Sequence, residues 1–221
     1  MLKSNQHKIE LCGWLKKKYP TLYNNPVKMH AFLFLYECVT KTEDGTADFS
    51  NLYGYKKCLF FRDVFNDYMK NFPLFDAKVN SSYDTFINKA NDEIKIRIDK
   101  VGFLTYTLSD KELFEFLHSL NIWKCKSEEI TEKETGIQLK ESDFSEEDLK
   151  KTQGIKEIIK PEQIWNSRIL KINEKCFIID KDNMQKLTES HIDILFDLTE
   201  NADIHSPIFI VLDEQGGIHI M

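Results

Sequence analysis

Apolar residues in the first 125 positions recur mainly at the spacing of an α-helix. Residues 5–19 predict a short amphipathic helix that ends at Pro20, because the residue before a proline avoids helical backbone. Asn25 and Pro26 then predict a new helix, with asparagine as the cap and proline in the first turn. Residues 26–38 are apolar on every face, which is typical of a helix at the centre of a fold. We therefore expect this helix to form the core.

Three further helices and one short extended piece are expected before residue 125. The extended piece is expected at 51–57, and the helices at 61–72, at 83–100 and from 109 onward. Pro73 and Gly102 are expected to end the first two of these helices. Ser109 and Glu112 form a capping-box pattern, which predicts the start of the third.

Residues 126–160 differ in character from the helical region. They hold ten acidic and seven basic residues and few aromatic ones. This composition favours a solvated connector. One short helix is expected to begin after Ser145, with Asp148 as the partner in a second capping box.

The C-terminal region combines strand patterns with one helix. Two hairpins are expected around that helix, the first from 165–172 and 176–179, the second from 207–212 and 217–220 with its turn at 214–217. The predicted architecture is α+β. It consists of a mostly helical N-terminal domain over 1–125, a charged connector over 126–160, and a small β-hairpin/helix/β-hairpin module over 161–221.

Charge and composition narrow the setting of this 221-residue chain. No apolar run approaches the roughly 20 residues that span a bilayer, so a membrane protein is not expected. The five cysteines are widely spaced and odd in number, which favours reduced thiols and a cytoplasmic location. A net charge of −6 and a scarcity of arginine make nucleic-acid binding unexpected. The preference for lysine over arginine indicates an AT-rich genome, such as that of a low-GC bacterium or its phage.

Familiar catalytic and metal-binding motifs are missing from the sequence. There is no glycine-rich phosphate loop, no GxSxG elbow and no HExxH. Glu115 and His118 form one ExxH pair, but a di-iron bundle needs a second. Two aspartate pairs at helical spacing are expected to be ordinary acids and not metal ligands: Asp63 with Asp67, and Asp193 with Asp197. We expect no cofactor, no metal and no enzymatic activity.

Aromatic residues are concentrated in one short stretch. They are Tyr53, Tyr55, Phe60, Phe61, Phe65 and Tyr68. Most are expected in the core. Half-exposed tyrosine and phenylalanine are also favoured anchors of protein interfaces, so this stretch is a candidate contact surface.

Residues 26–36 read PVKMHAFLFLY and residues 52–68 read LYGYKKCLFFRDVFNDY. Together they resemble the Panacea domain, the SocA-like antitoxin family also described as phage-associated GepA-type proteins. The resemblance covers about residues 5–125. The chain departs from the family pattern at residues 58–60, where it has Cys-Leu-Phe and the family has Gly-Pro-Val.

The resemblance implies a non-enzymatic antitoxin that neutralises a co-encoded toxin by direct contact. The net charge of −6 would suit a basic toxin. The family-pattern positions are Lys28, Tyr36, Tyr55, Asp63, Asp67 and Tyr68. With Phe61 added from the aromatic stretch, these are the expected partner-binding residues.

Two other classes of function remain open. A phage-encoded inhibitor of a host defence system, such as an anti-CRISPR protein, would use the acidic stretch 128–148 to imitate nucleic acid. An enzyme of unfamiliar type would use Cys58 or His118, with carboxylates that meet only in the fold. A deep polar pocket that joins these side chains would favour the enzyme.

Overall fold

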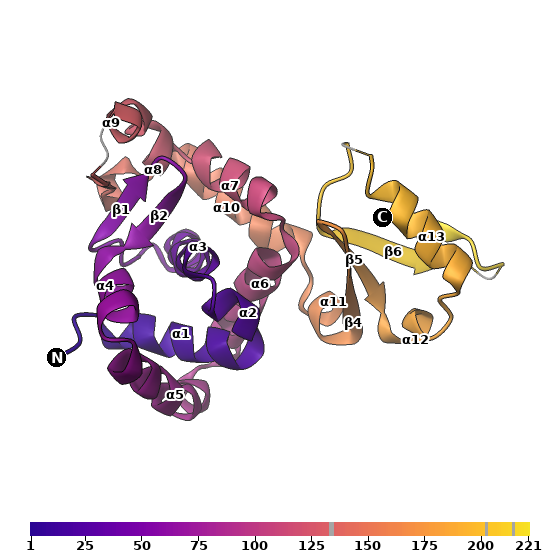
Figure 1. Cartoon of the computed structure of the whole chain (residues 1–221), viewed down its shortest axis with the longest axis horizontal. Helices are drawn as coiled ribbons and strands as arrows, with labels where there is room; N and C mark the ends of the chain where they lie inside the picture. The colour runs from indigo at the N-terminus through magenta and orange to yellow at the C-terminus, as the bar shows by residue number, and fades with distance from the viewer. Residues whose placement is uncertain (133–134, 202, 214) are drawn as a thin grey trace.

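Helix α3 (Pro26–Asp44) lies at the centre of the N-terminal domain, where the other helices and a small sheet surround it (Figure 1). The computed structural model describes residues 1–132, 135–201, 203–213 and 215–221. The side chain of Asn25 accepts hydrogen bonds from the backbone N–H groups of Val27 and Lys28, as an N-cap does. Gly45 ends the helix with a left-handed backbone, φ 73°. The predicted core helix is confirmed.

The helical domain contains ten helices, one 3-10 turn and three strands within the part of the chain that the structure describes. They are α1 (Gln6–Lys18), α2 (Pro20–Tyr23), α3, β1 (Leu52–Tyr55), β2 (Cys58–Phe61), α4 (Arg62–Lys70), α5 (Phe72–Lys89), α6 (Asp92–Thr107), α7 (Asp110–Ser119), α8 (Asn121–Lys124), α9 (Ser127–Glu132), β3 (Ile137–Gln138), η1 (Glu141–Asp143) and α10 (Glu146–Ile158). The short strands form a sheet in the order β2-β1-β3, and all its pairs are antiparallel.

Three predicted helix boundaries are wrong. The long helix expected at 83–100 is divided between α5 and α6, because Asn91 caps a new helix by accepting from the N–H of Ile94. Gly102 does not end a helix but lies inside α6. A Cβ atom there would lie 2.5 Å from the ring of Trp14, so close packing of α1 on α6 requires this glycine.

Pro73 begins a helix instead of ending one. It lies in the first turn of α5, where a proline costs no hydrogen bond. The extended piece expected at 51–57 is the first strand of the hairpin β1–β2, which places Tyr53 opposite Phe60.

The segment 126–160 is not the solvated connector that its charge predicts. Strand β3 pairs with β1, and α10 packs along α3 and α6. Its apolar residues Ile130, Leu139 and Ile155 are at most 5% exposed, so they complete the core of the helical domain. The predicted capping box of Ser145 and Asp148 is confirmed, and the Asp148 carboxylate also accepts from the N–H groups of Asn121 and Ile122 at the start of α8.

The C-terminal module has a four-stranded sheet in the order β4-β5-β6-β7. Its elements are α11 (Pro161–Asn166), β4 (Ser167–Ile172), β5 (Lys175–Asp180), α12 (Lys181–Met184), α13 (Glu189–Leu198), β6 (Ile208–Leu212) and β7 (Ile218–Ile220). The two hairpins are antiparallel, and β5 and β6 join them as a parallel pair. The predicted α+β architecture is confirmed. Residue 214 of the expected second turn lies outside the described residues.

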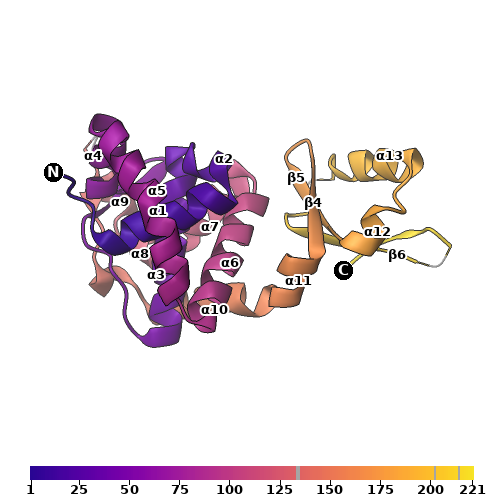
Figure 2. The same cartoon turned by 90° about the horizontal axis from the view of Figure 1, so that it is seen from below.

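The sheet of the module lies between α13 and the helical domain (Figures 1 and 2). On one face, Phe177 and Ile179 form an apolar cluster with Leu195 of α13. On the other face, Ile178 packs with Phe103 of α6 and with Ile159. Strand β5 is therefore buried on both sides. Among the described residues, no helix combines the length and the apolar character that a bilayer crossing requires.

Candidate partner-binding site

Three of the seven expected partner-binding residues lie deep inside the helical domain, and Lys28 is buried as well, at 9% exposed. Tyr36, Phe61 and Asp67 are each at most 2% exposed. Side chains this deep contribute to folding and cannot meet another protein without local unfolding. The expectation that they contact a partner is therefore not supported by their position.

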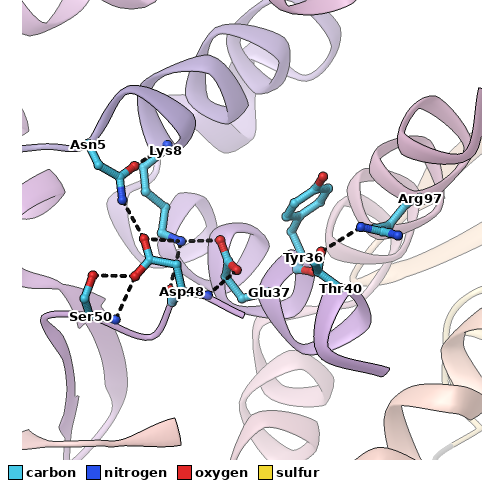
Figure 3. A network of polar contacts seen from close by, with 8 residues as sticks. All are labelled: Asn5, Lys8, Tyr36, Glu37, Thr40, Asp48, Ser50 and Arg97. Atoms are coloured by element: carbon cyan, nitrogen blue, oxygen red, sulfur yellow. Dashed lines mark hydrogen bonds and ion pairs between the residues drawn. The ribbon is translucent and has the colours of Figure 1, made fainter. Parts of the chain in front are cut away.

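Tyr36 and Phe61 lie beside buried charges that explain their positions. Arg97 lies 5.9 Å from the centroid of the Tyr36 ring, and burial raises the pKa of this tyrosine (Figure 3). The Nζ atom of Lys8 lies 4.4 Å from the centroid of the Phe61 ring. The same Nζ forms an ion pair with the buried Glu37, so Phe61 covers an internal salt bridge.

Asp67 fixes the start of the chain to α4. One of its carboxylate oxygens accepts from the backbone N–H groups of Lys3 and Ser4 and from the Ser4 hydroxyl, each at 2.7 Å. Three donors on one oxygen satisfy a buried charge, so this aspartate has a structural role. The expectation that Asp67 is an ordinary acid at the surface or in a first helical turn is therefore wrong.

The other four expected residues reach the surface to different extents. Lys28 is largely buried, but its Nζ lies 3.0 Å from a carboxylate oxygen of the exposed Asp110. Tyr55 and Asp63 are half-buried, and Asp63 accepts a 2.7 Å hydrogen bond from Asn51. Tyr68 is half-buried as well.

Tyr68 borders an exposed apolar surface where α4 meets α5. Its ring packs edge-on against that of Phe72, with 5.2 Å between the centroids. Three large apolar residues here remain in contact with solvent: Met69 is 57% exposed, Phe72 40% and Leu74 53%. We call Tyr68, Met69, Phe72 and Leu74 the α4–α5 corner. Figures 1 and 2 place it on the side of the helical domain away from the C-terminal module.

A second feature is a cavity of 460 Å³ between α3, the turn of the β1–β2 hairpin and α7. We call it the α3–α7 cavity. Its apolar lining residues are Val27, Ala31, Leu59, Leu113, Phe114 and Leu117. Its polar ones include Lys28, Lys57, Asp110 and Lys111, together with Cys58 and His118. The cavity thus contains both candidate side chains of the enzyme interpretation, but most of its lining is apolar.

The protonation states of Cys58 and His118 do not suit nucleophilic catalysis. Burial raises the pKa of the Cys58 thiol to about 11. Burial also lowers the pKa of His118 to about 4, and its ring is stacked on that of Trp123 at 3.8 Å. Near pH 7 both groups are neutral, whereas a cysteine–histidine dyad works with a thiolate. The cavity is therefore suited to binding apolar groups.

No group of three histidine, cysteine, aspartate or glutamate side chains within the described ranges is arranged to hold a metal ion. The expected helix that carries Asp193 and Asp197 is α13, where both residues are exposed. The His118 ring stacks on Trp123 and lies against Phe114, so this histidine serves packing, whereas the exposed Glu115 lies 3.9 Å from Lys111.

Comparison of the chain with protein-family models, curated proteins and solved structures finds no match. The geometry of the site therefore carries the argument for function.

Sequence reasoning missed the three exposed residues of the α4–α5 corner. Met69, Phe72 and Leu74 follow the aromatic stretch directly, but the apolar spacing predicts one helix over 61–72 that ends at Pro73, and not a junction between two helices. The signal that could have found them is the dipeptide Phe72-Pro73 itself. A proline in a first turn begins a second helix and turns its first residues outward.

Proposed function

We propose that this chain is a non-enzymatic protein-binding antitoxin that neutralises a co-encoded toxin by direct contact. The observation that carries the proposal is the α4–α5 corner, where large apolar side chains are exposed next to Tyr68. Soluble proteins rarely expose such clusters unless another molecule covers them. Aromatic and methionine side chains are also enriched in the centres of protein interfaces.

The resemblance of residues 26–36 and 52–68 to the Panacea domain supports the same function. One of the family-pattern residues, Tyr68, belongs to the α4–α5 corner, and Asp63 lies five residues before it on the same helix. The neutral state of Cys58 and His118 supports a role in binding over one in catalysis. The net charge of −6 favours a basic partner, because long-range attraction accelerates its association.

The test uses the short reading frames that flank this one, expressed alone and together with the chain. We expect one of them to stop growth and the chain to restore it. The double substitution Phe72→Ser with Leu74→Ser should abolish the rescue. With the purified pair, calorimetry should show binding at least about tenfold weaker, as for hot-spot residues.

Phe196→Ser is the matched control, because Phe196 is 50% exposed but belongs to α13. It should leave the rescue and the affinity unchanged. Full rescue by the double variant, or the absence of any toxic neighbour, would show that the proposal is wrong. Both variants replace exposed side chains, so circular dichroism should confirm that they fold.

The alternative is a phage-encoded inhibitor of host defence that imitates nucleic acid through the stretch 128–148. The fold gives it less support, since the exposed Lys140 stands among the acids of this stretch and Asp148 is buried. Deleting the stretch is not a clean test, because it would remove core residues Ile130 and Leu139. Changing the exposed Glu128, Glu132 and Glu146 to glutamine tests it without that damage: lost inhibition would favour this alternative.

A further inference from the structure

Helix α13 exposes an acidic and apolar surface that the helical domain does not cover. Leu195 is buried against the sheet, whereas Ile192, Ile194 and Phe196 are 39%, 47% and 50% exposed. The exposed Asp193 lies between the first two of them. Within the described residues this helix contains no lysine or arginine.

Three acidic residues lie one helical turn apart along α13. They are Glu189, Asp193 and Asp197, and all three are exposed. No ion pair joins Asp193 or Asp197 to any other residue in the part of the chain that the structure describes. An apolar patch with an acidic border is suited to a partner that is apolar with a basic border.

The α3–α7 cavity has that complementary chemistry. Its rim carries Lys28, Lys57 and Lys111 against the single carboxylate of Asp110, which pairs with Lys28. This local excess of positive charge stands out on a chain of net charge −6. Lys57 and Lys111 are exposed, and the only charged partner that the structure gives Lys111 among the described residues is the exposed Glu115, 3.9 Å away on the same helix, so both lysines can pair with carboxylates of an incoming segment.

The floor of the cavity can receive apolar side chains. Leu113 and Leu117 of α7 are buried there, and Val27 of α3 is 45% exposed. A volume of 460 Å³ lies within the range of sites that enclose ligands, of about 300–1,000 Å³. An aromatic ring such as that of Phe196 is therefore accommodated.

The α13 helix of the same chain is not placed to fill this cavity. It covers the face of the sheet opposite to the one that packs on the helical domain. Figures 1 and 2 both show it away from α3 and α7. The occupant must then come from another molecule.

From this charge complementarity we infer that the chain self-associates, with α13 of one copy seated in the α3–α7 cavity of a second. Phe196 and Ile192 enter the apolar floor, and Asp193 and Asp197 pair with Lys57 and Lys111. A two-fold arrangement fills both cavities at once, so the assembly closes as a dimer. The contact uses neither Phe72 nor Leu74 and is independent of toxin binding at the α4–α5 corner.

Analytical ultracentrifugation of the full chain across the micromolar to hundred-micromolar range tests this inference. We expect a concentration-dependent dimer that weakens at high salt, because exposed ion pairs are screened. Phe196→Ser, and separately Lys57→Glu with Lys111→Glu, should each raise the dissociation constant at least about tenfold. Phe72→Ser with Leu74→Ser is the control and should leave the dimer unchanged.

A charge exchange distinguishes this contact from any other. Adding Asp193→Lys and Asp197→Lys to the Lys57→Glu, Lys111→Glu variant should restore the dimer. A chain that is monomeric at every concentration would overturn the inference. So would a dimer that none of these substitutions weakens, or one that the charge exchange fails to restore. The growth-rescue experiment measures toxin binding independently of self-association. Failure of the dimer proposal would therefore not contradict the antitoxin proposal, and the reverse also holds.

Discussion

His30 shows at the scale of a single residue how burial fixes a protonation state. It is fully buried on α3, and its Nδ1 accepts a 3.1 Å hydrogen bond from the N–H of Phe61. The proton is therefore on Nε2, which lies among aromatic rings and has no hydrogen-bond partner within the described residues. Burial lowers the pKa of His30 to about 3. The folded protein thus holds this histidine neutral throughout the physiological range.

This histidine predicts an acid-sensitive fold. Its pKa is about 6.5 when unfolded and about 3 when folded, so between these values the unfolded chain binds more protons. The free energy of unfolding should therefore fall as the pH drops below about 6.5, by up to about 1.4 kcal/mol per pH unit from this one group. Half-buried His118 acts in the same direction. Urea denaturation between pH 7 and pH 4 measures the slope.

His30→Asn is the matched variant, because its side-chain oxygen can replace Nδ1 as the acceptor for Phe61. We expect a less stable protein with a shallower pH dependence over the same range. An unchanged slope would contradict the assignment of the acid sensitivity to His30.

At the scale of secondary-structure elements, α10 shows how a highly charged segment can belong to a core. It presents Thr152 and Ile155 to the inside, and the Thr152 hydroxyl lies 2.6 Å from that of Thr42 on α3. Its exposed charged residues include Glu146, Glu147, Lys150 and Glu157, whereas Asp148 is buried. Composition averages over the two faces, and for that reason it predicted a connector.

Two neighbouring substitutions in α10 test its role. Ile155 is 5% exposed, so Ile155→Ala should lower the free energy of unfolding by about 2–4 kcal/mol. Gly154 has open space where a Cβ would lie, so Gly154→Ala should raise it by about 0.5–1 kcal/mol through helix propensity. Thermal denaturation of both variants and of the wild type compares their free energies of unfolding. A solvated connector would tolerate Ile155→Ala without loss.

Local signals in the sequence predicted local structure well. Asn25-Pro26, Ser109 with Glu112 and Ser145 with Asp148 each mark a helix start that the structure confirms, because a cap depends only on residues a few positions apart. Signals that depend on distant partners failed. Gly102 faces Trp14 across the fold, and nothing near it in sequence reveals that contact.

The candidate site shows the same difference between local signals and signals that depend on distant partners. The sequence identified the aromatic stretch but could not separate buried Phe61 from exposed Phe72, since both are phenylalanines at the ends of apolar runs. Exposure there is decided by Lys8 and α1, which cover Phe61, and by the sharp junction between α4 and α5, which leaves Phe72 outside.

At the scale of the whole molecule, one carboxylate connects the helical domain to the C-terminal module. Glu112 of α7 accepts a 2.9 Å hydrogen bond from the N–H of Ser109 and a 2.7 Å hydrogen bond from the N–H of Ser206. The Nζ atom of Lys175 on β5 lies 3.8 Å from the Oε1 atom of Glu112. Burial alone would raise the pKa of Glu112, but these hydrogen bonds outweigh it and lower the pKa below its usual 4.5.

Removing this carboxylate should loosen the connection between the two parts. We expect Glu112→Ala to increase the radius of gyration in small-angle X-ray scattering. Ser109→Ala is the control, because it weakens the same helix cap but keeps the bond to Ser206. A lowered carboxylate pKa stabilises the fold above about pH 4.5 and ceases to do so as the pH falls through the folded pKa, so the wild type should expand in acid. Equal radii for both variants would contradict this role.

The position of α3 has a consequence for synthesis of the chain. Its contact with α10 joins Thr42 to Thr152, which are 110 residues apart. At about 5–20 residues per second, a ribosome needs on the order of ten seconds to deliver the second partner after the first. Throughout that interval one of the most apolar helices of the chain lacks part of its cover. Nascent molecules therefore offer chaperones a binding segment that the finished protein conceals.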